Sequence, residues 1–433
     1  MKKLPSSDMS ATDLTKKEKN LCYLVLLFFL VLYNPFKEQV GVLGMWPIFV
    51  YSFIFNTPAQ KIQLLKKNRG LQLLIAFFIF NLLSILWSHN LKDGISWLGI
   101  RIALFVLPVA LGTIIIRPAA KERIIYFFAG ATTLAAVGCF LRGIYRAMSY
   151  HDQSLLYNDN LTDIIHLQSI YFAMLVNLAI FSYAWLWIKR SPQLNKSAAI
   201  VVILFLLVLH FLLASRVAII ILYSSIFIFA CAYLIRRKKI LEGATLLTGL
   251  LIGSFLLIKF FPKTINRFKE LSFTQFKYSN NGAESHFNMA VTADQWNGAN
   301  LRLAVWQCGL TVIRQNILFG VGLGDKTDAL QQQYAVKGFS FGIRTHRNMH
   351  SNYLDVWLSM GITGLILFVM AFFIMPLRRA IKDREWLSFA IIICISFSMF
   401  SETYMDRTTG NILLGFFFGL LTAFDSQKSQ ADQ

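Results

Sequence analysis

Apolar runs long enough to span a membrane alternate with short polar connections along almost the whole chain. A helix needs roughly 17 to 25 apolar residues to cross about 30 Å of hydrocarbon, and about twelve runs approach that length. They cover residues 21–36, 41–56, 71–87, 95–116, 124–145, 167–188, 197–214, 217–235, 241–261, 352–376, 385–404 and 408–424. Such continuous runs indicate helices rather than the short alternating strands of a barrel. The pattern therefore predicts an all-α polytopic membrane protein with about 12 transmembrane helices.

One long polar segment, residues 262–351, separates the ninth run from the tenth. Within it, Leu303, Trp306, Leu310 and Ile313 recur at spacings of three and four, which predicts a helix over residues 300–314 with one apolar face. A second helix is expected to extend through Tyr334, after a glycine-containing turn. The predicted organisation is a tail at 1–19, helices 1–9 within 20–261, a large helical loop at 262–351, helices 10–12 within 352–424 and a second tail at 425–433. Function is expected in the loop, because it is the longest polar surface that the chain offers.

Composition supports the membrane assignment and adds an orientation. Hydrophobic residues make up 56 % of the 433 residues, charged residues only 15 %, and the mean hydropathy is +0.55. Lysines and arginines are concentrated in alternate connections and in the amino-terminal tail. Because cationic loops resist translocation, this asymmetry predicts that both termini are cytoplasmic and that the 262–351 loop faces outward. It also accounts for the net charge of +20 without a nucleic-acid partner.

The loop contains residue types suited to phosphate chemistry. Arginine donates paired hydrogen bonds to phosphate oxygens, and histidine accepts a proton from a hydroxyl near neutral pH. Together they suggest transfer from a lipid-linked phosphate or pyrophosphate donor to a hydroxyl acceptor. His346 and His350 are four residues apart, but no neighbouring carboxylate or cysteine completes a ligand set, so no metal site is predicted. Cys308 is the only cysteine of the loop, so the loop cannot hold a disulfide of its own.

Several short motifs are similar to those of the O-antigen ligase and polymerase superfamily. The similar positions are Arg302-x-x-x-Trp306, the stretch Asn316 to Asp325 with Gly320, Gly322 and Gly324, His350-Ser-Asn352-Tyr353-Leu354, Gly361-Ile-Thr-Gly364-Leu365, the Ser215-Arg216 pair and Ser84-Ile-Leu-Trp87-Ser88. The resemblance extends over most of the chain and includes the predicted spans and the large loop. Asp325 departs from the family pattern, which often has Asn or another polar residue at this position.

The resemblance implies a function and its location. Proteins of this kind transfer a glycan from undecaprenyl pyrophosphate to a sugar hydroxyl of lipid A-core, with inversion at the sugar and without a metal or cofactor. The reaction takes place on the periplasmic face of the bacterial inner membrane. Arg216 and Arg302 are implied to hold the pyrophosphate. His350 is implied to activate or to orient the acceptor hydroxyl.

Other polar residues are supporting candidates, and two alternatives stay open. The candidates are Arg101, His166, Arg347, Asn352 and Glu402; ionisable groups within membrane spans are often functional, although Glu402 and Arg407 could simply pair with one another. The first alternative is a polymerase of the same superfamily, which shares this plan. The second is a transporter of a lipid-linked glycan, although transporters usually concentrate their polar residues at the membrane midplane.

Overall fold

The computed structural model describes residues 14–34, 40–236, 239–284 and 295–425. Almost every regular element in these residues is helical, which confirms the all-α prediction. The helices up to the loop are α1 (Lys16–Leu32), α2 (Val40–Leu43), α3 (Met45–Phe55), α4 (Pro58–Lys67), α5 (Arg69–Ser84), η1 (Ile85–Trp87), α6 (Leu91–Arg101), α7 (Ala103–Gly112), α8 (Pro118–Ser149), η2 (Gln153–Leu156), α9 (Asn158–Thr162), η3 (Asp163–Ile165), α10 (Ser169–Ile188), α11 (Lys196–Leu212), α12 (Arg216–Cys231), η4 (Ala232–Arg236) and α13 (Ile240–Phe260). The loop contains α14 (Pro262–Lys269), η5 (Glu270–Ser272), α15 (Asn300–Gln315), α16 (Lys326–Val336) and α17 (Ser340–Arg344), and it is followed by α18 (Asn352–Val369), η6 (Met370–Ile374), α19 (Met375–Lys382), α20 (Trp386–Phe400), η7 (Tyr404–Asp406) and α21 (Thr408–Thr422).

Six helical segments of the described residues are long and apolar enough to cross a membrane. They are Arg69–Trp87, Leu91–Gly112, Pro118–Ser149, Ser169–Ile188, Ile240–Phe260 and Asn352–Lys382. Five shorter apolar helices accompany them: Met45–Phe55, Lys196–Leu212, Arg216–Cys231, Trp386–Phe400 and Thr408–Thr422. These helices indicate a multi-pass membrane protein. The number of twelve spans stays a prediction.

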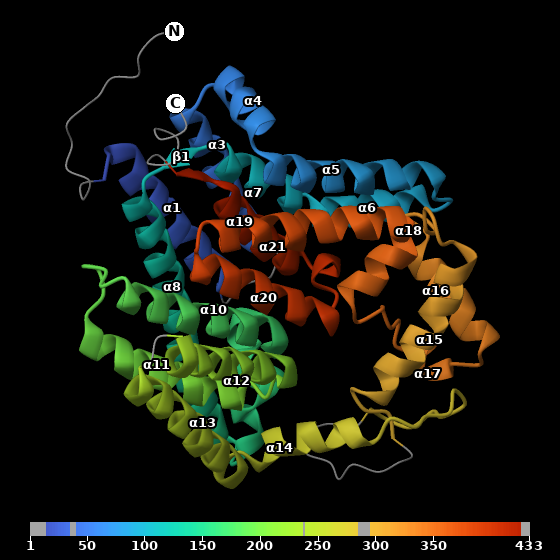
Figure 1. Ribbon diagram of the computed structural model, residues 1–433. Helices are drawn as coiled ribbons and strands as arrows, with labels where there is room; N and C mark the ends of the chain where they lie inside the picture. Colours follow the sequence, from blue (N-terminus) through green and yellow to red (C-terminus); the bar gives the residue numbers. More distant parts are fainter. Residues whose placement is uncertain (1–13, 35–39, 237–238, 285–294, 426–433) are drawn as a thin grey trace.

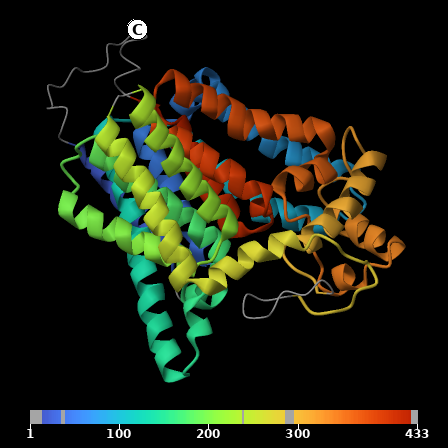
Figure 2. The ribbon, with the colours of Figure 1, turned by 60° about the horizontal axis from the view of Figure 1, so that its bottom comes forward.

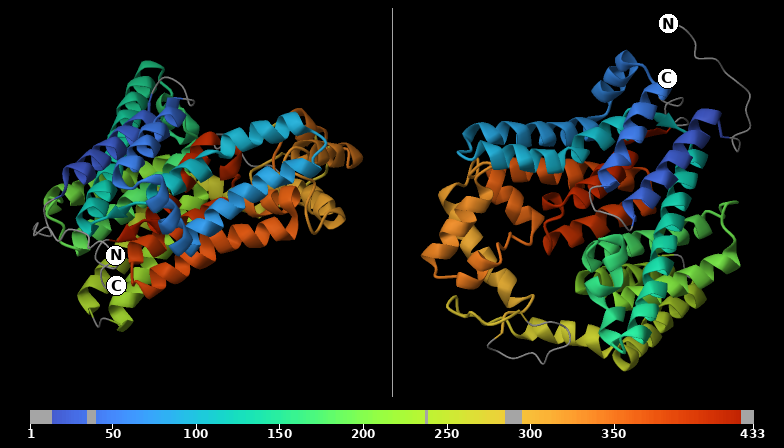
Figure 3. Two further views of the ribbon diagram at one scale, coloured as in Figure 1. Left: turned by 90° about the horizontal axis from the view of Figure 1, so that it is seen from above. Right: turned by 180° about the vertical axis from the view of Figure 1, so that it is seen from behind.

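The loop helices gather at one end of the helical bundle. Figure 1 shows α15, α16 and α17 together beyond the ends of α5, α6 and α18, and the rear view in Figure 3 shows the same grouping. A two-residue parallel pair, β1 (Ile115–Ile116) with β2 (Phe424–Asp425), lies at the opposite end. The end of α8 and the following short helices project from the bundle as a separate arm (Figure 2).

Helix α18 is broken where the loop packs against it. Gly361 has a φ of 66°, so the helix is interrupted there, and an added Cβ atom would collide with the backbone of Leu318. The segment that follows α15 runs alongside the interruption, and Ile362 N donates a hydrogen bond to Ile317 O at 2.8 Å. Gly322 N donates to Ser359 O at 2.9 Å in the same arrangement. Glycine is required at the interruption because other residues rarely adopt this backbone conformation and because the backbones approach too closely for a side chain.

The predicted loop helix is confirmed as α15, but its predicted apolar face is wrong. The most deeply buried side chains are those of Leu301, Ala304, Val305, Cys308 and Val312, together with Ile313 from the predicted set. Leu303, Trp306 and Leu310 are only partly buried. The helix packs against α16 on one side and α18 on another, so its buried surface is wider than one stripe and is centred on smaller residues.

Candidate active site

Arg302 extends from the first turn of α15, and the start of that helix is fixed by side-chain hydrogen bonds. Asn297 Oδ1 accepts hydrogen bonds from Ala299 N at 2.8 Å and from Asn300 N at 3.0 Å. These bonds satisfy backbone donors that a helix start leaves without an intrahelical partner. Asn297 also donates through Nδ2 to Phe273 O at 2.9 Å, which ties the start of α15 to the segment that leads out of η5.

The Arg302 guanidinium is held by three acceptors on two segments. Its Nη1 donates to Gly298 O at 2.5 Å and its Nε donates to Ser401 O at 3.1 Å. Its Nη2 lies 3.9 Å from Glu402 Oε2. About 23 % of the side chain remains exposed. The guanidinium is thus fixed in orientation yet accessible, as a group that receives an anionic substrate must be.

His350 reaches the same carboxylate from a different direction. It lies in the turn between α17 and α18 with a φ of 44°, in the left-handed region, and its N–H donates to Asn348 Oδ1 at 3.2 Å. Its Nδ1 is 3.3 Å from Glu402 Oε2. When Nδ1 carries the proton, it donates to the carboxylate and Nε2 is the nitrogen left to accept another proton.

Glu402 therefore connects the two predicted residues Arg302 and His350. Burial opposes ionisation of its carboxyl, but the hydrogen bond to His350 and the nearby charges of His350 and Arg302 outweigh it and lower its pKa. Thr403 N adds a hydrogen bond to Oε1 at 3.2 Å. Glu402 is accordingly a carboxylate at neutral pH. Its ion-pair partners among the described residues are Arg302 and His350 rather than Arg407, so the suggested Glu402–Arg407 pair does not form there.

Arg216 lies beside Arg302, although the two residues come from different helices. Arg216 is the first residue of α12, directly after Ala214 with its φ of 51° and Ser215. A Cβ atom added at Gly298 would lie 3.1 Å from Arg302 Nη1 and still closer to Arg216 Nη2. Both guanidinium groups therefore flank the same backbone position. Two cations at one point create a positive potential that favours a polyanion such as pyrophosphate.

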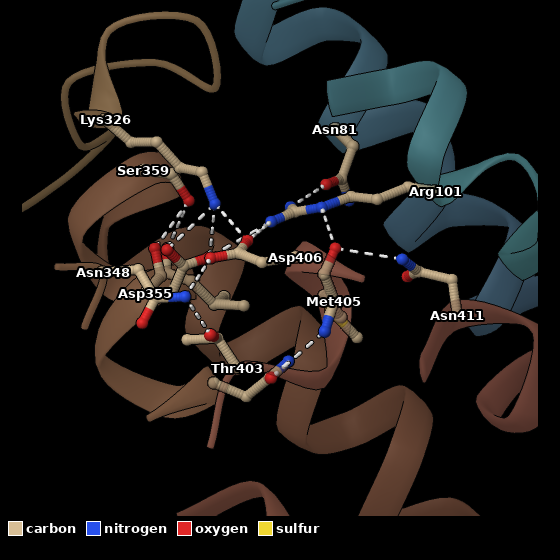
Figure 4. Close-up of polar contacts among 12 residues, drawn as sticks. Asn81, Arg101, Lys326, Asn348, Asp355, Ser359, Thr403, Met405, Asp406 and Asn411 are labelled. Atoms are coloured by element: carbon tan, nitrogen blue, oxygen red, sulfur yellow. Dashed lines mark hydrogen bonds and ion pairs between the residues drawn. The ribbon is translucent and has the colours of Figure 1, made fainter. Parts of the chain in front are cut away.

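A buried cluster of four charged residues lies next to the segment that carries Glu402. It consists of Arg101 from α6, Lys326 from α16, Asp355 from α18 and Asp406 from η7, and Figure 4 shows them pointing toward one another. Arg101 Nη2 is 3.1 Å from Asp355 Oδ2 and 3.5 Å from Asp406 Oδ1. Lys326 Nζ is 3.0 Å from Asp355 Oδ1 and also contacts Asp406 Oδ1. Each side chain is at most 4 % exposed, and two cations balance two anions.

Residues 199–369 match the family model described as O-antigen ligase. This match supports a relationship to the O-antigen ligase superfamily. The match contains Arg216, Arg302 and His350, whereas Glu402 lies beyond its end. Neither the comparison with curated proteins nor that with solved structures finds a match.

The match confirms the resemblance found in the sequence and indicates a membrane enzyme of the ligase or polymerase type. It also implies a lipid-linked glycan donor and a glycan acceptor. The individual roles of the predicted site residues stay predictions. What the structure adds is their placement: Arg216, Arg302, His350 and Glu402 lie together, and Arg101 belongs to the buried charge cluster.

The other three supporting candidates have different surroundings. Arg347 pairs with Glu284 and its Nε donates to Thr345 Oγ1 at 3.1 Å, so its guanidinium is engaged within the loop. Asn352 is fully buried at the start of α18, and its Oδ1 accepts from Met405 N at 3.3 Å. His166 has a φ of 52° and lines a small cavity with Arg407.

Asn348 links the buried charge cluster to the turn that carries Glu402. Its Nδ2 donates to Thr403 Oγ1 at 2.6 Å and to Asp406 Oδ2 at 3.2 Å (Figure 4). Its Oδ1 accepts a hydrogen bond from His350 N. One amide thus holds the His350 turn against the segment that begins with Glu402. This contact fixes the relative position of the imidazole and the carboxylate.

Asp325, the departure from the family pattern, joins the loop to the bundle. Its carboxylate accepts hydrogen bonds from His89 N and Asn90 N, each at 2.8 Å, at the start of α6. Burial opposes ionisation, but these hydrogen bonds outweigh it and lower the pKa of Asp325. The glycine-containing stretch therefore forms a turn that packs on the bundle. A separate observation concerns metals: the described residues contain no group of three His, Cys, Asp or Glu placed to hold a metal ion.

Sequence reasoning did not identify Gly298, Lys326, Asn348, Asp355 or Asp406. Asp355 gave a usable signal, because it is a carboxylate inside a predicted membrane span and such groups are costly without a partner. The others carry no local signal, since a glycine, an asparagine or a charged residue near the surface of a loop is ordinary.

Proposed function

We propose that this protein is a glycosyltransferase that moves a glycan from undecaprenyl pyrophosphate to a sugar hydroxyl of lipid A-core on the periplasmic face of the inner membrane. The observation that carries the proposal is the convergence of two guanidinium groups with a carboxylate–imidazole pair in a chain whose residues 199–369 match the O-antigen ligase family. The reaction breaks the bond between the anomeric carbon and pyrophosphate oxygen and forms a bond from that carbon to the acceptor oxygen.

Arg216 and Arg302 bind the diphosphate of the donor in this proposal. Negative charge grows on the leaving pyrophosphate as the anomeric bond breaks, so preorganised cations stabilise the transition state more than the ground state. Arg302 is fixed by Ser401 O and Gly298 O before substrate binds, so little reorganisation accompanies the reaction. Guanidinium groups supply this stabilisation without proton transfer, and the proposed mechanism uses no cofactor.

His350 accepts the proton of the attacking hydroxyl. Glu402 holds the imidazole through Nδ1 and, as a carboxylate, stabilises the imidazolium that forms when Nε2 takes the proton. Attack on the face opposite the pyrophosphate gives inversion at the anomeric carbon. The proton then leaves His350 for water, and undecaprenyl pyrophosphate departs.

Purified protein incubated with lipid-linked glycan and acceptor lipid tests the proposal. His350→Ala should reduce transfer about 10²- to 10⁴-fold, and Arg302→Ala should reduce it about 10²- to 10³-fold. Glu402→Gln keeps the shape of the side chain but removes its charge, so it should lower the rate while leaving donor binding in place. Arg314→Ala, at an exposed arginine in the last turn of α15, is the matched control and should transfer at the wild-type rate.

Undiminished transfer by both His350→Ala and Arg302→Ala would refute the assigned site. The acceptor profile of cells that lack the protein distinguishes the two enzyme types. Loss of all polymer from the lipid core indicates a ligase, whereas a single repeat unit on the core indicates a polymerase.

A further inference from the structure

A small cavity lies near the far end of the turn that carries Glu402. It has a volume of about 40 Å³ and is lined by His166, Leu167, Gln168, Tyr171, Arg407 and Thr409. The lining residues come from the start of α10 and the start of α21 and from the segments just before them. One water molecule needs roughly 10–15 Å³ of such cavity volume, so the cavity has room for a group of a few heavy atoms.

Tyr171 provides an independent sign that the cavity receives a ligand. Tyr171 is among the residues that line the cavity, it is 3 % exposed, and its ring packs edge-on against Tyr404 with centroids 4.6 Å apart. Its hydroxyl has no hydrogen-bond partner within the described part of the chain. A buried hydroxyl without a partner is costly, and such groups in native proteins usually mark a missing water, ion or substrate.

The lining of the cavity selects for an anion. Arg407 is a lining residue whose guanidinium forms no ion pair with any residue that the structure describes, and the lining residues Gln168 and Thr409 carry further hydrogen-bond donors. His166 adds an imidazole that can donate as well. No carboxylate is among the lining residues. A tetrahedral oxyanion fits both the size of the cavity and its excess of donors.

The position of the cavity relates it to the transfer site. Arg407 follows Glu402 by five residues, so their Cα atoms are at most about 18 Å apart along an extended chain, and the intervening helix η7 shortens that distance. Tyr404, which contacts Tyr171, lies between them in the sequence. A short oligosaccharide with its reacting hydroxyl at His350 is long enough to reach the cavity.

We propose that this cavity binds a phosphate group of the acceptor, so that the enzyme selects phosphorylated acceptor glycans. The proposal rests on the proposed function and names a second contact between the acceptor and the protein. Arg407 and the Tyr171 hydroxyl donate to the phosphate oxygens. The same chemistry suits the phosphate of a phospholipid headgroup, and the experiment separates these two sources.

The test compares phosphorylated acceptor with the same acceptor after enzymatic removal of its phosphates, for the wild type, Arg407→Ala and Tyr171→Phe. Wild-type kcat/KM should be about tenfold higher for the phosphorylated acceptor, the size of effect that one charge-assisted hydrogen bond gives. Arg407→Ala should remove this preference, and Tyr171→Phe, which keeps the ring, should reduce it severalfold. Arg314→Ala should retain it.

A second arm uses vesicles of phosphatidylcholine with and without phosphatidylglycerol. If the wild-type rate depends on the anionic lipid and Arg407→Ala abolishes this dependence, the bound phosphate belongs to a lipid headgroup. An unchanged acceptor preference and an unchanged lipid dependence in Arg407→Ala would overturn the proposal.

Equilibrium binding of both acceptors to the His350→Ala protein keeps the result separate from the transfer reaction. If the wild type transfers no glycan, the proposed function fails. The cavity proposal is still supported if the His350→Ala protein binds the phosphorylated acceptor more tightly and if adding Arg407→Ala removes this preference. Equal binding of both acceptors to this protein would overturn the proposal.

Discussion

Replacing Lys326 by methionine tests whether the buried charge cluster holds the loop to the membrane helices. Lys326 is on α16 of the loop, whereas its partners Asp355 and Asp406 are on α18 and η7. Methionine is an unbranched side chain of nearly the same length, but it has no charge, so the contact between Lys326 Nζ and the Trp97 ring, whose centroid lies 4.1 Å away, is lost together with the ion pairs. The substitution therefore removes one positive charge and little packing.

The expected loss follows from the geometry. Lys326 Nζ lies 3.0 Å and 3.1 Å from the two oxygens of Asp355 and contacts Asp406 as well, and these side chains are 4 % exposed. Without Lys326, Arg101 is the one cation that the described part of the chain leaves beside the two buried carboxylates. Removing one partner of a buried ion pair costs about 3–5 kcal/mol, because the remaining charge stays buried without compensation.

A double-mutant cycle isolates this interaction. Lys326→Met and Asp406→Asn each leave a net charge in the cluster, whereas the double variant leaves the neutral Arg101–Asp355 pair. The double variant should therefore be more stable than the sum of the single effects predicts, by about 1–3 kcal/mol. Unfolding free energies are measured by titration with sodium dodecyl sulfate in mixed micelles. Lys337→Met, at an exposed lysine that follows α16, is the control and should change stability by less than about 0.5 kcal/mol.

Two results would contradict this reasoning. Strict additivity of the two substitutions would show that Lys326 and Asp406 do not interact in the folded protein. A Lys326→Met protein as stable as the Lys337→Met protein would show that the cluster does not hold the loop.

Two further predictions concern the approach of the loop to the bundle. Gly298→Ala places a Cβ atom against both guanidinium groups, so the KM for the lipid-linked donor should rise at least tenfold in the transfer assay. The control Gly249→Ala, where a Cβ atom meets no other atom within 4 Å, should leave this KM unchanged. Equal KM values for the two variants would contradict the assigned diphosphate site. Asp325 has a lowered pKa, so its ionised form stabilises the fold above the ordinary pKa of about 3.9, and this contribution is lost as the pH falls through the folded-state pKa. The wild type should therefore melt at a higher temperature than Asp325→Asn at pH 6, and this difference should shrink as the pH falls below the ordinary pKa of the carboxyl. A difference in melting temperature that does not depend on pH would exclude this role.

The amino-acid sequence by itself determined which segments are helical and apolar. Helix α10, Ser169–Ile188, begins within two residues of the predicted start at 167, and α15 begins at the predicted residue Asn300. Hydrophobic runs and helical periodicity report the burial of each segment, and this information is local in the chain. The motifs around Arg216, Arg302 and His350 were equally readable, because each motif is a short stretch of sequence.

Only the tertiary structure decided which residues meet. Glu402 contacts His350 from 52 residues away, and Asp355 contacts Arg101 across 254 residues. Hydrophobic periodicity does not specify such pairs, since it records whether a side chain is buried and not what buries it. The apolar face of α15 was predicted incorrectly for the same reason: α16 and α18 cover the helix from two sides, and a single stripe of large residues does not reveal the second. Folding removes charged residues that are far apart in the sequence from water at the same place. A buried charge without a partner costs free energy, so such residues become ion-pair partners only in the folded protein.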